Sequence, residues 1–177
     1  MKLLVTGSDG FIGKNLKIFL KEKGHKIIEF TRFDSIDELK NKISRVEAIF
    51  HLAGVNRTNK SELFREVNVN LTNLICNYLI EKEIKVPIFF SSSIHALHDN
   101  EYGKSKREAE KILHDLALNN KNPILIYRLP GVFGKWCRPN YNSVVATFCY
   151  NIARNIPVNI FDGEKKIELL YIDDLIK

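Results

Sequence analysis

The sequence predicts an α/β fold in which helices flank a doubly wound, parallel β-sheet. Short apolar runs alternate with helical patterns along the chain, which is typical of parallel strands joined by crossover helices. A glycine-rich turn lies between the first apolar run and the first helical pattern. With 177 residues, of which 45% are hydrophobic, the chain is long enough for one domain with a substantial core.

Each element follows from a local pattern. The strands are short apolar runs, expected at 2–6, 26–31, 48–52, 87–91 and 123–128. The helices have apolar residues at helical spacing and are expected at 11–23, 35–43, 61–82, 101–117 and 144–154. Gly24 ends the first helix, and Ser35 with Glu38 forms a capping box at the start of the second. Shorter strands are expected at 158–161 and 169–172, with a helix start at 173–177.

Composition narrows the class of protein. The net charge of +6 comes from scattered lysines, which indicates solvated helix faces, with attraction of an anionic ligand as the alternative. The sequence has no stripe of basic and aromatic residues that would indicate nucleic-acid binding. It also has no apolar stretch that approaches the roughly 20 residues of a membrane span. Three cysteines without C-x-x-C spacing indicate free thiols and a cytoplasmic protein. His95 and His98 lack a third ligand in a suitable pattern, so no metal site is expected.

The turn after the first strand carries glycines at Gly7, Gly10 and Gly13, with Phe11 and Ile12 between the last two. A pyrophosphate needs backbone N–H donors at a helix N-terminus and no Cβ in the way. Gly7 would allow the tight turn, Gly10 the approach to the phosphates, and Gly13 the packing of helix on strand. The turn therefore predicts a dinucleotide cofactor in a Rossmann-type fold, with a purely structural turn as the alternative.

The end of the second strand favours NADP(H) over NAD. An acidic residue at this point holds the ribose 2′-OH of NAD, whereas an arginine accommodates the 2′-phosphate of NADP. The residue here is Arg32. Asp34 follows closely and could still reach a ribose, so NAD stays the alternative.

Three hydroxyls and a Tyr–Lys pair predict a carbonyl site. Tyr102 and Lys106 open a helix four residues apart and so share one face. A phenol titrates near pH ~10, and a nearby ammonium is expected to lower that pKa and assist proton transfer. Ser91, Ser92 and Ser93 end a buried strand, where ligands lie in open α/β sheets. Ser93 is expected to donate to a substrate carbonyl, with Ser92 as the second choice.

Together these motifs resemble the extended short-chain dehydrogenase/reductase family, the NAD-dependent epimerase/dehydratase group that acts on nucleotide sugars. The resemblance rests on the glycine turn, the Tyr–Lys pair and the segments 51–54, 68–74, 91–93, 127–134 and 171–174. A narrower resemblance at 132–148 is to capsular and O-antigen UDP-sugar reductases of the UDP-N-acetyl-L-fucosamine route. It implies reduction of a 4-keto group by NADPH, with a metal-binding cupin domain following the reductase domain.

The resemblance also implies residue roles. Tyr102 would be the general acid, and Lys106 would hold the nicotinamide ribose. Further residues would lie near the cofactor: Leu52, Ala53, Gly54, Leu129 and Pro130. The UDP-sugar would contact Ser93, Arg138, Asn142 and Ser143. Residues 1–177 would be an NAD(P)-binding Rossmann domain that is incomplete at the C-terminus, with the sugar-binding part and any cupin domain absent. This domain would form a homodimer through helices 61–82 and 101–117.

The sequence therefore predicts an NADPH-dependent reductase of a UDP-4-keto-hexose in capsular or O-antigen polysaccharide precursor synthesis. Two alternatives stay open. The same fold serves NAD-dependent nucleotide-sugar 4-epimerases and dehydratases, although no Asp-Glu pair follows Ser93 to support the dehydratase reaction. The chain could also bind the cofactor without turnover.

Overall fold

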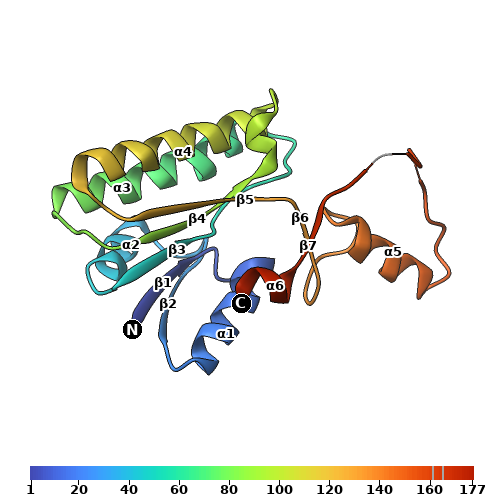
Figure 1. Ribbon diagram of the computed structural model, residues 1–177, viewed down its shortest axis with the longest axis horizontal. Coiled ribbons are helices and arrows are strands. Elements are labelled where there is room, and N and C mark those ends of the chain that lie inside the picture. Colours follow the sequence, from blue (N-terminus) through green and yellow to red (C-terminus); the bar gives the residue numbers. More distant parts are fainter. Residues whose placement is uncertain (161, 165) are drawn as a thin grey trace. The chain divides into compact units, whose positions relative to one another are not determined.

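The computed structural model describes residues 1–160, 162–164 and 166–177 (Figure 1). The chain divides into two compact units, Met1–Arg128 and Leu129–Lys177. The first unit contains the predicted glycine turn, the serine trio and the Tyr–Lys pair.

In the first unit, five strands form one sheet in the order β2–β1–β3–β4–β5. The strands are β1 (Lys2–Thr6), β2 (Lys26–Phe30), β3 (Ala48–His51), β4 (Ile88–Ser93) and β5 (Ile124–Leu129). β1 pairs in parallel with β2 and β3, and β3 pairs in parallel with β4. The chain adds β2 on one side of β1 and then crosses over to add β3 on the other, so the strand order reverses at β1. Ligands in open α/β sheets bind beyond the carboxyl ends of the strands at such a reversal.

Helices cover both faces of this sheet, which confirms the predicted fold class. α1 (Phe11–Glu22) lies on one face, and α3 (Leu71–Glu81) and α4 (Glu101–Asn120) lie side by side on the other (Figure 1). α2 (Ile36–Ile43) packs against α3.

The main core lies between the sheet and the helices α2, α3 and α4. The strand register pairs Leu4 with Ile49 and Ile49 with Ile88, so fully buried side chains form a row across three strands. Helical side chains cover this row: Leu39, Ile43, Ile75, Leu79, Leu113 and Leu116. Because burial of each such side chain stabilises by about 1.5–3 kcal/mol, this layer fixes the strand ends that carry the site.

Several element bounds differ from the prediction. The helix expected at 61–82 begins as a π-helical turn, η1 (Phe64–Asn70), before α3, and a short 3₁₀ turn, η2 (Ile94–Leu97), follows β4. The capping box is confirmed, because Ser35 Oγ accepts from the backbone N–H of Glu38 at 3.2 Å and Glu38 Oε2 accepts from that of Ser35 at 2.6 Å. α4 extends beyond the predicted end at residue 117 and stops at Asn120. The next residue, Lys121, takes the left-handed conformation and ends the helix, although it is not a glycine.

In the second unit, β6 (Gly131–Phe133) pairs in parallel with β7 (Leu169–Tyr171), which confirms the strand expected near 169–172. α5 (Val144–Ile152) and α6 (Ile172–Ile176) are its helices. The strand expected at 158–161 is not formed at 158–160, and Phe161 lies outside the described residues. Among the described residues of both units, no helix is long and apolar enough to cross a membrane.

Candidate active site at the carboxyl edge of the sheet

The glycine turn after β1 leaves no room for side chains. Gly7 has a φ of +66°, and a Cβ there would lie 2.8 Å from the backbone N of Ala53. A Cβ at Gly13 would lie 2.9 Å from Ser8 Cα and closer still to the Gly7 carbonyl, so the helix start packs directly on the turn. The turn thus contacts the loop that follows β3, at the point where the strand order reverses.

The N-terminus of α1 is open to an anion. Its N-cap, Gly10, offers no side-chain cap, and its first turn carries no acidic residue. Ser8 Oγ is buried and has no hydrogen-bond partner within the described part of the chain. A helix N-terminus has free N–H groups and a partial positive charge, so this cradle fits a pyrophosphate. It contains the predicted cofactor residues of the turn, which are Gly7, Gly10, Phe11, Ile12 and Gly13.

A buried hydrogen-bond network holds the loop that follows β3. Thr72 Oγ1 donates to the carbonyl four residues earlier, so it accepts from His51 Nε2, at 2.9 Å. His51 Nδ1 then accepts from Thr6 Oγ1 at 2.8 Å, and Thr6 Oγ1 accepts the backbone N–H groups of residues 52 and 53 at 3.1 Å. Burial, with the charge of Lys106, lowers the pKa of His51 to about 3. The neutral imidazole therefore holds the Thr6 hydroxyl in place, and that hydroxyl fixes the backbone of the predicted cofactor residues Leu52 and Ala53.

Close after the end of β2, the carboxylate of Asp34 accepts hydrogen bonds from Thr31 and Lys42. Its Oδ2 accepts from the backbone N and the Oγ1 of Thr31 at 2.7 and 2.8 Å, and its Oδ1 accepts from Lys42 Nζ. Burial works to raise the pKa of Asp34, but the hydrogen bonds from Lys42 and Thr31 hold it below its usual value. Arg32 is exposed, with its guanidinium carbon 5.3 Å from the ring centre of Phe33. The strand end therefore presents a cation.

Ser93 and Tyr102 meet where β4 ends and α4 begins. The Ser93 hydroxyl is near enough to the Tyr102 phenol to lower its pKa, and Ser93 Oγ accepts from the backbone N–H of His95 at 3.2 Å. The Tyr102 ring is close to those of Phe64 and His95, with its ring centre 5.9 Å from each of theirs. The phenol thus lies near a serine hydroxyl and close to two aromatic rings.

Lys106 lies beside the same strand end. Its Nζ donates to the Ser91 carbonyl at 2.9 Å and lies 4.8 Å from the ring centre of Phe90. A Cβ at Gly54 would lie 3.2 Å from Lys106 Nζ, so this glycine leaves space beside the ammonium. The structure therefore brings the three predicted catalytic residues to one strand end.

The expected lowering of the Tyr102 pKa by Lys106 is contradicted. Burial raises the pKa of Tyr102, and the nearby Ser93 hydroxyl opposes this only in part. Burial also lowers the pKa of Lys106 to about 8, against an opposing effect of Glu110. The physical reason is that the ammonium is bound to the Ser91 carbonyl rather than to the phenol. Tyr102 therefore keeps its proton at neutral pH.

Ser92, the second choice for the carbonyl donor, has a different partner. Its hydroxyl donates to Oε1 of the buried Glu110. Arg128 donates to both carboxylate oxygens, from Nε to Oε1 at 3.0 Å and from Nη2 to Oε2 at 2.6 Å. Burial works to raise the pKa of Glu110, but the hydrogen bonds from Arg128 and Ser92 hold it below its usual value. Sequence reasoning missed this trio, although Glu110 follows Lys106 by one helical turn.

Sequence reasoning also gave no role to Asn68, which is 1% exposed. Its Nδ2 donates to the Val55 carbonyl and to Ser105 Oγ, both at 2.9 Å, and its Oδ1 accepts from the Val55 N–H at 2.8 Å. Ser105 Oγ donates in turn to the Tyr102 carbonyl at 2.7 Å. Asn68 lies in the π-helical turn η1, a feature frequent at functional sites, and connects the loop after β3 to the first turn of α4.

The other predicted binding residues belong to the second unit: Leu129, Pro130, Arg138, Asn142 and Ser143. Ser143 is the N-cap of α5, where its Oγ accepts from the backbone N–H of Ala146 at 3.3 Å. Its hydroxyl therefore already has a structural role. The guanidinium carbon of Arg138 lies 5.4 Å from the ring centre of Tyr141.

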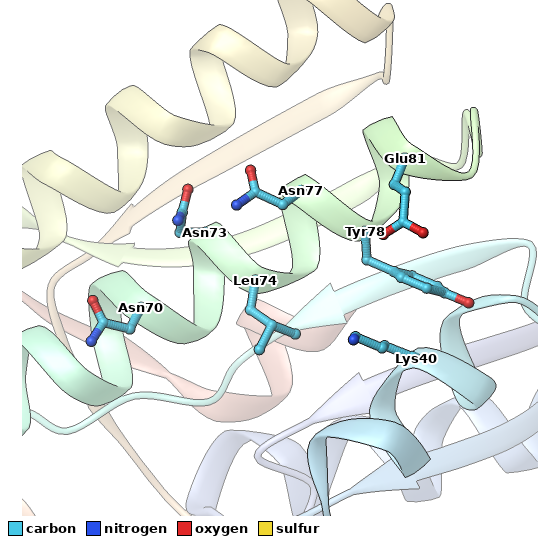
Figure 2. Close-up of a pocket in the computed structure, with 7 residues that line it drawn as sticks. All are labelled: Lys40, Asn70, Asn73, Leu74, Asn77, Tyr78 and Glu81. Carbon is cyan, nitrogen blue, oxygen red and sulfur yellow. The ribbon is translucent and has the colours of Figure 1, made fainter.

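A surface cavity of about 330 Å³ beside α2 and α3 is separate from this site (Figure 2). Figure 2 shows side chains from both helices along it, and its lining is Lys40, Asn70, Asn73, Leu74, Asn77, Tyr78 and Glu81. Tyr78 is anchored there by a 2.8 Å hydrogen bond between its hydroxyl and that of Ser44. None of the predicted site residues lines this cavity.

The reversal of strand order, the glycine cradle and the cluster at the end of β4 are features of the dinucleotide-binding α/β proteins. The chain belongs to the NAD dependent epimerase/dehydratase family, which residues 3–177 match. Members of this family bind NAD(P).

The names of individual relatives are more specific than the description of the family. The chain is 49% identical, over 178 aligned residues, to UDP-2-acetamido-2,6-beta-L-arabino-hexul-4-ose reductase of Pseudomonas aeruginosa, and covers 48% of that protein. The capsular polysaccharide assembling protein CapF of Staphylococcus aureus superposes with a TM-score of 0.87 at 41% identity, over 99% of this chain and 47% of CapF. The chain thus spans about half the length of these two relatives. UDP-glucose 4-epimerase of Thermotoga maritima shares the fold, with a TM-score of 0.89 at 24% identity over 99% of this chain and 71% of the epimerase.

Proposed function

We propose that this chain forms the NADPH-binding, carbonyl-reducing part of a UDP-4-keto-hexose reductase. The observation that carries the proposal is the placement of Ser93, Tyr102 and Lys106 at one strand edge next to an open helix N-terminus. The 49% identity to a UDP-4-keto-sugar reductase, over the whole of this chain, supports the substrate class. The likeness to CapF supports a place in the synthesis of capsular or O-antigen polysaccharide precursors.

The glycine cradle would hold the pyrophosphate of the cofactor, and the backbone at Leu52, Ala53 and Gly54 would lie along it. Two features support NADPH over NADH. Arg32 presents a cation at the end of β2, where a 2′-phosphate lies in this kind of fold. Asp34, the acidic residue that would accept a ribose 2′-OH, is already bound to Thr31 and Lys42.

When bound, NADPH supplies a hydride at C4 of its nicotinamide ring. Ser93 would donate a hydrogen bond to the substrate carbonyl, and Tyr102 would protonate the oxygen as negative charge develops on it. The raised pKa of Tyr102 suits this direction, because a reductase needs the protonated phenol, whereas an alcohol oxidation begins with the phenolate. Lys106 would hold the nicotinamide ribose. Leu129 and Pro130 would contact the nicotinamide.

The sugar nucleotide would be recognised by Ser93 together with Arg138, Asn142 and Ser143. Arg138 supplies a cation for a diphosphate, and Ser143 retains its O–H as a donor because its hydroxyl oxygen acts only as an acceptor in the α5 cap. We also propose a homodimer through the helices at 61–82 and 101–117.

The test is to mix the full-length protein with NADPH and a UDP-4-keto-hexose and to follow the loss of NADPH absorbance. The expected result is stoichiometric conversion of NADPH and the ketone, with NADH a poorer donor. Interconversion of UDP-sugar 4-epimers, or loss of water from the sugar, with tightly held NAD and no net NADPH use would identify an epimerase or a dehydratase instead. Binding of NADPH without turnover of any ketone would leave a cofactor-binding protein.

A further inference from the structure

A buried carboxylate, that of Glu110, lies next to the residues of the proposed site. Glu110 is 8% exposed and follows Lys106 by four residues, so both side chains lie on one face of α4. It accepts hydrogen bonds from Ser92 on β4 and from Arg128 on β5. One side chain therefore joins the catalytic helix to the ends of two strands.

This carboxylate affects the charge of Lys106, which is 4% exposed. Within the described residues, Glu110 is the charged group that raises the pKa of Lys106 against the effect of burial. The other titratable groups that face the ammonium add no negative charge, since His51 of β3 is neutral with a pKa of about 3 and Tyr102 of α4 keeps its proton. Arg128 of β5 is a second cation, bound to Glu110 itself.

The same contact fixes the direction of the serine hydroxyls. Ser92 is held toward Glu110, and this fixes the end of the strand from which Ser93, the next residue, extends near Tyr102. Loss of the contact would release both hydroxyls at the end of β4.

We propose that Glu110 is a positioning residue for the carbonyl reduction: it lies one helical turn from Lys106 as its buried counter-charge, and through Ser92 and Arg128 it fixes the end of β4 that carries Ser93. Its effect on the reaction rests on the proposed function, whereas its effect on Lys106 does not. Glu110 acts through these neighbours and contacts neither substrate nor cofactor.

Three variants separate charge from structure. Glu110→Gln keeps the size of the side chain and one acceptor oxygen but removes the charge. The double variant Glu110→Gln/Arg128→Gln also removes the cation that the first change leaves unpaired, since an unpaired partner is the main cost of breaking such a pair. Glu108→Gln is the matched control, because Glu108 lies on the same helix in an exposed ion pair with Arg65.

Two measurements are made on each variant. The first is an NMR titration of Lys106 with ¹⁵N-labelled lysine side chains, with the signal assigned through Lys106→Arg. The second is the pH profile of kcat/KM for NADPH-dependent ketone reduction by the full-length protein, which reports groups of the free enzyme.

In Glu110→Gln, Lys106 should lose its proton at a lower pH, and the alkaline limb of the rate profile should move by the same interval. The double variant should regain stability but keep both shifts, and Glu108→Gln should match the wild type. An unchanged Lys106 titration in Glu110→Gln, or a wild-type profile in the double variant, would reduce Glu110 to a structural residue. If the wild type reduces no ketone, the proposed function fails, and the lysine titration still decides whether Glu110 sets the charge of Lys106.

Discussion

Ser92 and Ser93 are adjacent, both are buried, and both carry the same hydroxyl, yet their surroundings differ. Ser92 donates to Glu110, whose oxygens are also bound by Arg128. Ser93 instead meets Tyr102, a phenol that can give up its proton to a ligand. The comparison teaches that one hydroxyl completes the fold, while its neighbour keeps a group available for chemistry.

Two helix N-termini of the first unit, those of α1 and α2, differ in the same way. α2 is closed by its own residues, through the Ser35–Glu38 capping box and the acidic Asp37 in its first turn. α1 has neither a side-chain cap nor an acidic residue there. A capped terminus stabilises its helix, whereas an uncapped one retains N–H groups for an anion.

The largest effect should come from removing the phenol hydroxyl. Tyr102→Phe removes the proposed acid, and kcat should fall by about 10²–10⁴-fold, the usual contribution of a positioned general acid. Steady-state kinetics measures this, with NADPH binding unchanged. Tyr127→Phe, at an exposed phenol on β5, is the control and should stay within about twofold. Unchanged turnover in Tyr102→Phe would remove Tyr102 from the mechanism.

The two serines should separate next. Ser93→Ala should lower kcat by about 10²–10³-fold, as the loss of an oxyanion donor does in other enzymes. Ser92→Ala should lower kcat by a smaller factor than Ser93→Ala does, since it only loosens the strand end that carries Ser93. It should also lower the free energy of unfolding by about 1 kcal/mol, because Glu110 loses a hydrogen bond. Kinetics and urea denaturation of both variants provide the test. The reverse pattern would make Ser92 the carbonyl donor.

Arg32 is a third group that we expect to bind a ligand rather than another part of the fold. Arg32→Gln should weaken NADPH binding by about 10- to 100-fold, since hydrogen bonds to charged groups contribute about 1.5–3 kcal/mol. Binding of NADH should change little, and calorimetry with both cofactors measures the difference. Arg45→Gln, at another exposed arginine of the first unit, controls for the loss of general positive charge. Equal weakening of both cofactors would argue against a 2′-phosphate contact.

The smallest expected effect is a pH dependence set by Lys106. Its pKa of about 8 in the folded chain lies below the usual value, so the ammonium is charged at neutral pH and loses its proton as the pH rises through 8. The kcat/KM of the full-length protein should therefore fall to about half its neutral value near pH 8, and further above it. A flat profile to pH 9 would show that the charge of Lys106 is not needed.

Local spacing was enough to predict much of this molecule. The three glycines and the capping box at Ser35 depend on contacts within a few residues, and the structure forms both features. The Ser92–Glu110–Arg128 trio could not be found in this way, because its partners come from three elements. The same holds for Asp34, whose partner Lys42 lies on the next helix, and for the Tyr102 pKa, which depends on burial.

The most direct measurement follows the hydride itself. The full-length protein is given a UDP-4-keto-hexose and NADPH with deuterium at both positions of nicotinamide C4, and the product is examined by mass spectrometry and NMR. Reduction as proposed places one deuterium on C4 of the sugar for each NADPH consumed. A converted sugar without deuterium at C4, with NADPH unspent, would contradict the account and indicate an epimerase or a dehydratase.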